Sequence, residues 1–315
     1  MTFFYMMALF AVGLVLIIKG GDWFVDAAVW LAGVLGVPQF LIGATVVSVA
    51  TTLPELTASA IAAFEGKVDM AVGNAVGSVT VNVSLILGVA VLGASFLIRR
   101  SQLWGQGALL AAGCLVALLC SLRGSLSALG CVLLLLLFLG YVAFNIYTAK
   151  KERSTERPAA RPGDRRRQIA GFLLGAAGIV VGAKLLVYSG SGIARMAGVP
   201  EAFIAVTIIS FGTSLPEFTI AVTAAVKKHT GLSAGNIVGA GVIDITLILP
   251  LCAVFSGRAL PISPQGLLLD MPVSLVAVLV CCVPALLTQR FRRWQGACMV
   301  GVYVLYVAAL LWLFV

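Results

Sequence analysis

Apolar segments long enough to cross a lipid bilayer dominate this chain. A transmembrane helix needs about 20 predominantly apolar residues. Ten such segments occur in the 315 residues, at 3–34, 40–63, 69–97, 104–121, 126–148, 169–197, 202–226, 232–256, 266–288 and 295–314. Charged residues make up 10% of the chain, against roughly 25% in a typical soluble domain. The sequence therefore predicts an all-α integral membrane protein with ten transmembrane helices, the first of which is not a cleaved signal peptide.

Basic residues are distributed unequally between alternate loops. The loops after the third, fifth, seventh and ninth helices hold 15 Lys and Arg residues, and those after the second, fourth, sixth and eighth hold four. Positively charged loops stay in the cytoplasm, so both termini are predicted to face outward. This distribution also accounts for the net charge of +9 without a nucleic-acid partner, and we expect none.

The most basic loop, 150–168, separates two hydrophobic halves, 1–149 and 169–315. Eight Lys and Arg residues lie between 150 and 167, so this linker is predicted to be cytoplasmic. A topology signal is the simpler interpretation of these charges. Contact with anionic lipid headgroups is the alternative.

The two halves contain an internal repeat. Residues 38–88 align with 200–250 at a shift of 162 residues, without a gap and with 18 identities in 51 positions. Five helices separate equivalent positions, and an odd number inverts the second copy in the membrane. Inverted repeats are typical of secondary transporters, whose binding sites lie near the membrane midplane where the repeats meet.

The second and seventh helices carry matching oxygen-bearing faces. The spacing i, i+3, i+4 and i+7 places four side chains on one side of each helix. These are Ser48, Thr51, Thr52 and Glu55 in the first half, and Ser210, Thr213, Ser214 and Glu217 in the second. A proline precedes each glutamate, and a proline inside a helix leaves the carbonyl four residues earlier without its usual donor. We expect the carbonyls of Ala50 and Gly212 to be freed in this way.

The third and eighth helices carry polar stripes that complete this pattern. Asn74, Ser78 and Asn82 recur every four residues in one, and Asn236, Ala240 and Asp244 in the other. Buried intramembrane charges cost at least about 2.5–3.5 kcal/mol, which indicates function rather than packing. Carboxylate, hydroxyl, amide and carbonyl oxygens suit hard cations such as Ca²⁺ and Na⁺.

These repeats resemble the alpha-repeats of the cation/Ca²⁺ exchanger superfamily. The resemblance rests on TTLPEL from Thr51 with GNAVGSVTVN from Gly73, and on GTSLPEF from Gly212 with GNIVGAGVID from Gly235. It implies a sodium/calcium exchanger-like fold of two inverted five-helix repeats and alternating access. The short central linker resembles that of prokaryotic members, which implies a location in the inner (plasma) membrane.

The resemblance also implies roles for individual residues. Glu55 and Glu217 correspond to paired Ca²⁺ ligands supported by Thr51 and Thr213, and Asn82 and Asp244 to the central polar pair. Thr52 and Ser214 correspond to residues that line Na⁺ sites, Ser78 corresponds to an outlying Na⁺ ligand, and Ser48 and Ser210 are expected to contribute backbone oxygens. Four positions depart from the family pattern, namely Ala50, Val79, Ala240 and Gly241. Ala240 lacks the hydroxyl that Ser78 keeps, which is expected to weaken an outlying Na⁺ site.

The leading hypothesis is an antiporter that exchanges Ca²⁺ for Na⁺. The alternatives are an antiporter on the same fold that exchanges Ca²⁺ or another divalent cation for H⁺, a cation channel and an inactive membrane scaffold. The inverted repeat with paired glutamates argues against the last two. We expect no enzymatic activity and no prosthetic group, and a monomer suffices because the site lies within one chain.

Overall fold

The computed structural model describes residues 3–152, 165–198, 210–257 and 259–314. Nine helices in this part of the chain are long and apolar enough to cross a membrane. The first half comprises α1 (Phe3–Leu35), α2 (Gln39–Ile42), η1 (Gly43–Val47), α3 (Ser48–Phe64), α4 (Val68–Thr80), η2 (Val81–Ile86), α5 (Leu87–Gly93), α6 (Arg100–Ser121) and α7 (Ala128–Glu152). The second half comprises α8 (Arg165–Met196), α10 (Ser210–Thr213), α11 (Leu215–Val226), α12 (Thr230–Ile243), η4 (Asp244–Ile248), α13 (Leu249–Ser256), η5 (Gly266–Asp270), α14 (Met271–Thr288) and α15 (Arg293–Phe314).

Most helix boundaries lie close to those predicted from hydropathy, with two corrections. The third helix was predicted to reach residue 97, but it ends at Gly93 because Ala94 is extended (φ −145°, ψ 117°). The ends of the predicted linker 150–168 are helical, since α7 continues to Glu152 and α8 begins at Arg165. The predicted helix 202–226 is described from residue 210 onward, and its earlier part lies outside the described residues.

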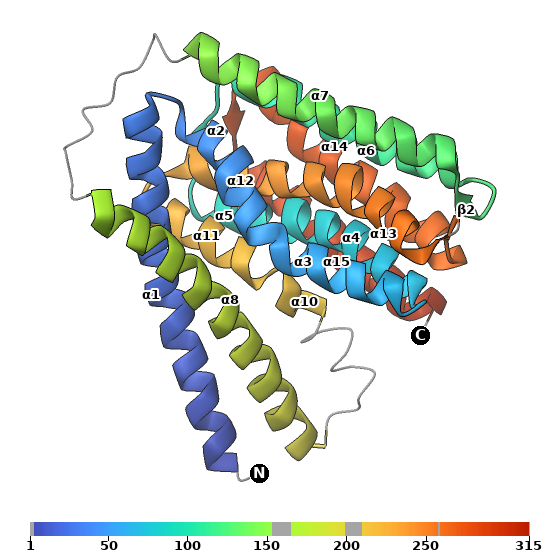
Figure 1. Cartoon of the computed structure of the whole chain (residues 1–315), viewed down its shortest axis with the longest axis horizontal. Coiled ribbons are helices and arrows are strands. Elements are labelled where there is room, and N and C mark those ends of the chain that lie inside the picture. Colours follow the sequence, from blue (N-terminus) through green and yellow to red (C-terminus); the bar gives the residue numbers. More distant parts are fainter. Residues whose placement is uncertain (1–2, 153–164, 199–209, 258, 315) are drawn as a thin grey trace.

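The two longest helices, α1 and α8, pack along each other and are tilted against the remaining helices (Figure 1). Glycines allow their backbones to approach closely. A Cβ atom at Gly20 would lie 2.8 Å from the carbonyl oxygen of Gly175, and one at Gly175 would lie equally close to the carbonyl oxygen of Gly20. Small residues at such contacts are typical of helix pairs in membranes, where close backbone packing drives association.

Two short antiparallel ribbons connect the halves. Strand β1 (Phe96–Leu97) pairs with β4 (Arg290–Phe291), and β2 (Ser125–Leu126) pairs with β3 (Leu260–Pro261). Each ribbon therefore takes one strand from each half. The loop between α5 and α6 therefore lies against the loop between α14 and α15, and the loop between α6 and α7 lies against the loop between α13 and η5. Each pair of loops belongs to one side of the membrane in the predicted topology.

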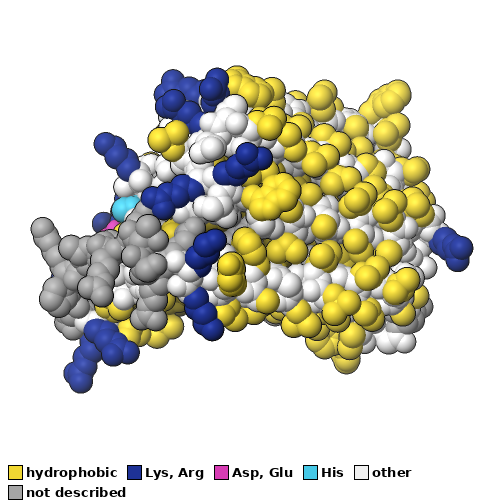
Figure 2. Space-filling model, turned by 90° about the horizontal axis from the view of Figure 1, so that it is seen from above, with side chains coloured by type: hydrophobic (Ala, Val, Ile, Leu, Met, Phe, Trp, Pro, Cys, Tyr) yellow, Lys and Arg dark blue, Asp and Glu magenta, His cyan; other side chains and the backbone are white. Residues whose placement is uncertain are grey.

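The outer surface is hydrophobic to a degree that suits lipid. Trp312 is 84% exposed and Phe4 is 83% exposed, and many other large apolar side chains are exposed along the long helices. On the face seen in Figure 2, hydrophobic side chains cover much of the surface and Lys and Arg side chains gather toward one end. The polar residues of α3, of α4 with η2, and of α12 with η4 lie inside the bundle instead.

Candidate cation site

The predicted oxygen-bearing face of the second helix is formed by α3. Its four members, Ser48, Thr51, Thr52 and Glu55, are all buried, with Glu55 and Ser48 fully inaccessible. Pro54 lies inside this helix, as predicted, and α3 continues through it to Phe64. The side chains that the 3.6-residue period places on one face therefore point into the bundle.

The equivalent segment of the second half is broken rather than continuous. Helix α10 ends at Thr213 and α11 begins at Leu215, because Ser214 adopts a non-helical conformation (φ −88°, ψ 7°). The prediction of a helix running through this point is therefore wrong. Pro216 lies in the first turn of α11, where its missing N–H costs nothing. Glu217 also lies in that first turn, near the positive end of the helix dipole, whereas Glu55 lies in the middle of α3.

Not every predicted member of the second face is described. Glu217 and Ser214 are buried, and Thr213 is half-buried. Ser210 begins α10, but its side chain lies outside the described residues.

The central polar pair lies in two π-helical turns. Asn82 is the second residue of η2, and Asp244 is the first residue of η4. Both side chains are fully buried. A π-helical turn widens the helix locally and is frequent at functional sites. Apart from the glycines that precede these turns, no sequence pattern predicts them.

Reciprocal hydrogen bonds join the two halves across this region. Thr51 Oγ1 donates to Asn236 Oδ1 at 3.1 Å, and Thr213 Oγ1 donates to Asn74 Oδ1 at 3.3 Å. The four residues are equivalent in pairs at the repeat shift of 162. Asn74 and Asn236 were predicted to lie on polar stripes but not among the cation ligands, and their identity between the repeats is the signal that points to them.

The amide groups of these two asparagines differ in one respect. Asn74 Nδ2 donates to Ser59 Oγ at 2.8 Å and to the Glu55 carbonyl oxygen at 3.3 Å. Asn236 Nδ2 has no hydrogen-bond partner among the described residues. The cause is in the sequence, because Ala221 stands where the repeat would place the counterpart of Ser59.

Three carboxyl groups are buried together in the bundle. Glu55, Glu217 and Asp244 are each 0% exposed, and Glu55 interacts electrostatically with both of the others. Their oxygens form no hydrogen bond of normal geometry within the described chain. The same part of the chain contains no group of three His, Cys, Asp or Glu side chains placed to hold one metal ion. The arrangement is thus a pair of glutamates with a nearby aspartate, surrounded by neutral oxygens.

Two of the positions that depart from the family pattern, Val79 and Gly241, lie near each other in an apolar environment. A Cβ atom at Gly241 would lie 3.2 Å from Leu110 Cδ1 and 3.8 Å from Val79 Cγ1. Val79 and Gly241 are equivalent in the repeat, so both halves lose a polar group at the same place. Ala240 is fully buried and Ser78 is 4% exposed, which leaves one hydroxyl at this pair of equivalent positions.

A second buried polar connection went unpredicted. Tyr141 of α7 donates a hydrogen bond to the carbonyl oxygen of Ala44 in η1. Asn145 Nδ2 donates to the Tyr141 carbonyl at 2.8 Å, and Gln106 Nε2 donates to Asn145 Oδ1 at 2.8 Å. Tyr141, Asn145 and Gln106 lie outside the aligned repeats, so the comparison of 38–88 with 200–250 could not reveal them.

An additional buried acid, Asp270, closes the π-helical turn η5. It accepts hydrogen bonds from Tyr306 Oη at 3.1 Å and Gln265 Nε2 at 3.2 Å. It lies beyond the end of the aligned repeat, which explains why the sequence comparison overlooked it. Tyr306 and Gln265 therefore satisfy the carboxylate oxygens of Asp270. The carboxylate oxygens of Glu55 and Glu217, in contrast, have no hydrogen-bond partner in the described chain.

A comparison with known families agrees with this architecture. The sequence profile of the sodium/calcium exchanger protein family matches residues 5–147 and 167–312, one match in each half. The chain belongs to the sodium/calcium exchanger family. The resemblance inferred from the repeat motifs is thereby confirmed, and so is the predicted fold class.

Three relatives of this sodium/calcium exchanger family member extend over nearly the whole chain. The inner membrane protein YrbG of Escherichia coli is 33% identical over 319 residues, covering 97% of this chain and 97% of that protein. The sodium/calcium exchanger MaX1 of Methanosarcina acetivorans is 28% identical, covering 96% and 97%. A solved structure of the sodium-calcium exchanger NCX_Mj, soaked with Na⁺ and Sr²⁺, has a TM-score of 0.85 at 28% identity, covering 98% and 99%. The protein is therefore an integral membrane member of a transporter family.

Proposed function

We propose that this protein exchanges Ca²⁺ for Na⁺ across the membrane by alternating access. The observation that carries the proposal is the pair of fully buried glutamates, Glu55 and Glu217, contributed by inverted halves and lacking hydrogen-bond partners in the described chain. Two carboxylates without protein partners match the charge of one divalent cation. Family membership supports the same substrates, since MaX1 and NCX_Mj are both named as sodium/calcium exchangers.

The proposed ligands are oxygen atoms from the four polar segments. Ca²⁺ takes six to eight oxygen ligands in flexible geometry, so two glutamates need neutral oxygens to complete the shell. The proposed cation-site residues are Glu55, Glu217, Asp244, Asn82, Thr51, Thr213, Thr52, Ser214, Ser78, Ser48 and Ser210. Thr52 Oγ1, Ser214 Oγ and both polar atoms of Asn82 lack hydrogen-bond partners within the described residues, which supports their assignment.

Competition for the same negative charge provides the coupling. A Ca²⁺ ion between Glu55 and Glu217 neutralises both carboxylates, and so do Na⁺ ions bound to the surrounding oxygens. Leaving the glutamates charged and unpaired in the bundle is costly. The loaded states are therefore favoured over the empty one, and exchange is favoured over uncoupled leakage.

The remaining features of the proposal concern its setting. The protein works in the inner membrane of a prokaryote, with both termini outside and the linker 150–168 in the cytoplasm, which the asymmetry of basic loops supports. The site lies within one chain, so a monomer suffices. Ca²⁺ and Na⁺ are its transported substrates, and it needs no prosthetic group.

The test is ⁴⁵Ca²⁺ uptake into proteoliposomes under an outward Na⁺ gradient. We expect uptake that requires the Na⁺ gradient, is absent under a matched K⁺ gradient, and disappears in the Glu55→Gln variant. Uptake driven by a pH gradient but not by Na⁺ would reassign the protein as a Ca²⁺/H⁺ antiporter. Absence of uptake from folded protein under every gradient would exclude Ca²⁺ as the substrate.

A further inference from the structure

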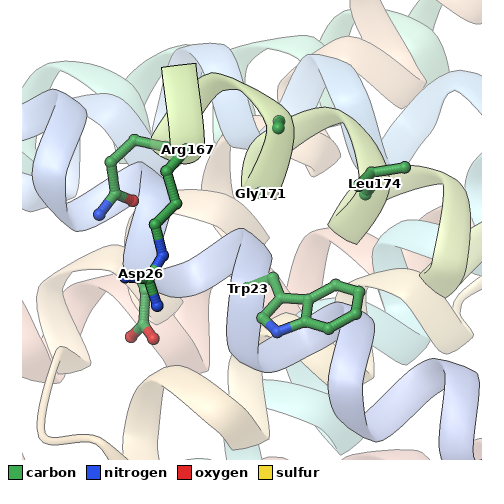
Figure 3. A pocket seen from close by; sticks show the side chains of 7 residues that line it. Trp23, Asp26, Arg167, Gly171 and Leu174 are labelled. Carbon is green, nitrogen blue, oxygen red and sulfur yellow. The ribbon is translucent and has the colours of Figure 1, made fainter. Parts of the chain in front are cut away.

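A groove lies on the outer surface where α1 and α8 run side by side. It has a volume of about 460 Å³ and is lined by Trp23, Asp26, Arg167, Gln168, Ala170, Gly171 and Leu174. Figure 3 shows Arg167 reaching from α8 toward Asp26 on α1, with Trp23 and Leu174 farther along the groove. One end of the groove is therefore polar and charged, and the other is apolar.

The apolar end faces the lipid phase. Trp23 is 51% exposed and Leu174 is 60% exposed, and both belong to helices that are long and apolar enough to cross a membrane. Tryptophan is enriched where the hydrocarbon core of a membrane meets the headgroups. Trp23 beside charged residues therefore suits the depth at which a phospholipid changes from acyl chain to headgroup.

The acid at the charged end, Asp26, already has a basic partner. Asp26 Oδ1 lies 2.8 Å from Lys227 Nζ, and Asp22 Oδ1 lies 3.2 Å from the same nitrogen. Burial alone would lower the pKa of Lys227, but hydrogen bonds to Asp26 and Asp22 raise it above its usual value. Lys227 therefore stays charged at neutral pH, and with Arg167 it balances the two carboxylates of Asp22 and Asp26. Arg167 forms no ion pair with the described residues and remains available to an anion.

We propose that this groove binds the phosphate headgroup of an anionic glycerophospholipid, with Arg167 on the phosphate and an acyl chain along Trp23, Gly171 and Leu174. Arginine presents a planar fork of donors that matches phosphate oxygens. Gln168 adds an amide donor at the same end. A lipid is favoured over a soluble anion because one wall of the groove is apolar and exposed, where a soluble anion gains nothing.

The proposed lipid site lies close to the end of α11, the helix that contributes Glu217 to the cation site. Lys227 immediately follows α11, whose first turn holds Glu217. A headgroup at Arg167 lies beside the Asp26–Lys227 ion pair, which joins α1 to the end of α11. The binding proposal itself does not depend on the proposed exchange activity, because it concerns a separate surface and is tested by binding.

The test is thermal unfolding of the purified protein in detergent, titrated with phosphatidylglycerol. We expect a saturable rise in Tm that zwitterionic phosphatidylcholine does not produce. The Arg167→Gln variant should need about fivefold more phosphatidylglycerol for the same rise, since one basic residue near an anionic membrane surface contributes about 1 kcal/mol. Arg166→Gln, the adjacent exposed arginine that does not line the groove, removes the same charge and should behave as the parent protein.

A second variant tests the shape of the groove without changing its charge. A Cβ atom at Gly171 would lie 3.6 Å from the Trp23 carbonyl oxygen, an ordinary contact, so Gly171→Leu should fold and fill the groove. It should lose the response to phosphatidylglycerol while keeping Arg167, and native mass spectrometry should detect less bound lipid. Equal losses in Arg166→Gln and Arg167→Gln would overturn the proposal in favour of general surface charge. An equal Tm rise with inorganic phosphate would assign the site to a soluble anion instead.

Discussion

Thr51 of the first half donates a hydrogen bond to Asn236 of the second, and the equivalent Thr213 of the second half donates one to Asn74 of the first. Each threonine lies four residues before a glutamate of the proposed cation site. The two bonds therefore hold the glutamate-bearing segment of each half against the asparagine-bearing helix of the other. A cation site at this interface depends on the register between the halves as much as on either repeat alone.

A double-mutant cycle should measure this bond. Thr51→Val and Asn236→Ala each remove one partner, and their effects on the free energy of unfolding should be non-additive by about 0.6 kcal/mol, the mean for interhelical hydrogen bonds in membranes. Thr57 provides the control, because its hydroxyl is exposed and bonds to Leu53 of its own helix. Thr57→Val should be additive with Asn236→Ala. Strict additivity of Thr51→Val with Asn236→Ala would show that the bond contributes nothing.

Glu217 and Asp244 should differ in importance although both are fully buried. Glu217→Gln should weaken Ca²⁺ binding about 100-fold, because a charged ligand becomes neutral. Asp244→Asn should weaken it by less than about tenfold, since its counterpart Asn82 is already an amide and an amide oxygen can still bind a hard cation. Isothermal titration with Ca²⁺ measures both. Equal losses would show that the charge of Asp244 matters to the ion as much as the charge of Glu217.

Restoring the missing hydroxyl should strengthen Na⁺ binding. Ala240 is fully buried and is equivalent to Ser78, so Ala240→Ser should lower the KM for Na⁺ about two- to tenfold, the range for one added polar contact. The KM for Ca²⁺ should change little. Na⁺-dependent ⁴⁵Ca²⁺ efflux measures both constants. Ala234→Ser on another face of α12 is the control, and a similar gain there would point to a general effect of serine.

Gly235 should tolerate no side chain. A Cβ atom there would overlap the carbonyl oxygen of Phe40, a backbone atom that cannot rotate away. Gly235→Ala should lower the free energy of unfolding by about 1–3 kcal/mol through overpacking. At Gly140 of α7 a Cβ atom meets no described atom within 4 Å, so Gly140→Ala should be neutral or stabilising. Thermal stability in detergent compares the two, and equal losses would show that the contact at Phe40 yields easily.

Removing the Tyr141 hydroxyl should disturb η1. Tyr141→Phe leaves the Ala44 carbonyl without its donor in the bundle interior, at a cost of about 1–3 kcal/mol. Exposed Tyr147 on the same helix is the matched control, and Tyr147→Phe should have little effect. Denaturant unfolding of the two variants measures the difference in their free energy of unfolding. An unchanged Tyr141→Phe protein would mean that another donor reaches this carbonyl.

Hydropathy and the repeat were sufficient to predict the helices and the polar faces, because a transmembrane segment and an i, i+3, i+4, i+7 pattern are local properties. The break at Ser214 was not predictable from the repeat, since TTLPE and TSLPE are nearly identical yet only the first forms an unbroken helix. The π-helical turns at Asn82 and Asp244 and the bond from Tyr141 to Ala44 arise from packing between distant segments. The periodicity of a single segment does not indicate which helix faces pack against each other.

The two ribbons described above, β1 with β4 and β2 with β3, have a consequence for the ancestry of the molecule. Together with the reciprocal threonine–asparagine bonds they give the halves an isologous interface, in which each partner presents the same surface to the other. This is how two separate copies of one polypeptide pair in a symmetric dimer. A single five-helix protein that inserted into the membrane in both orientations would meet its own inverted copy through these contacts.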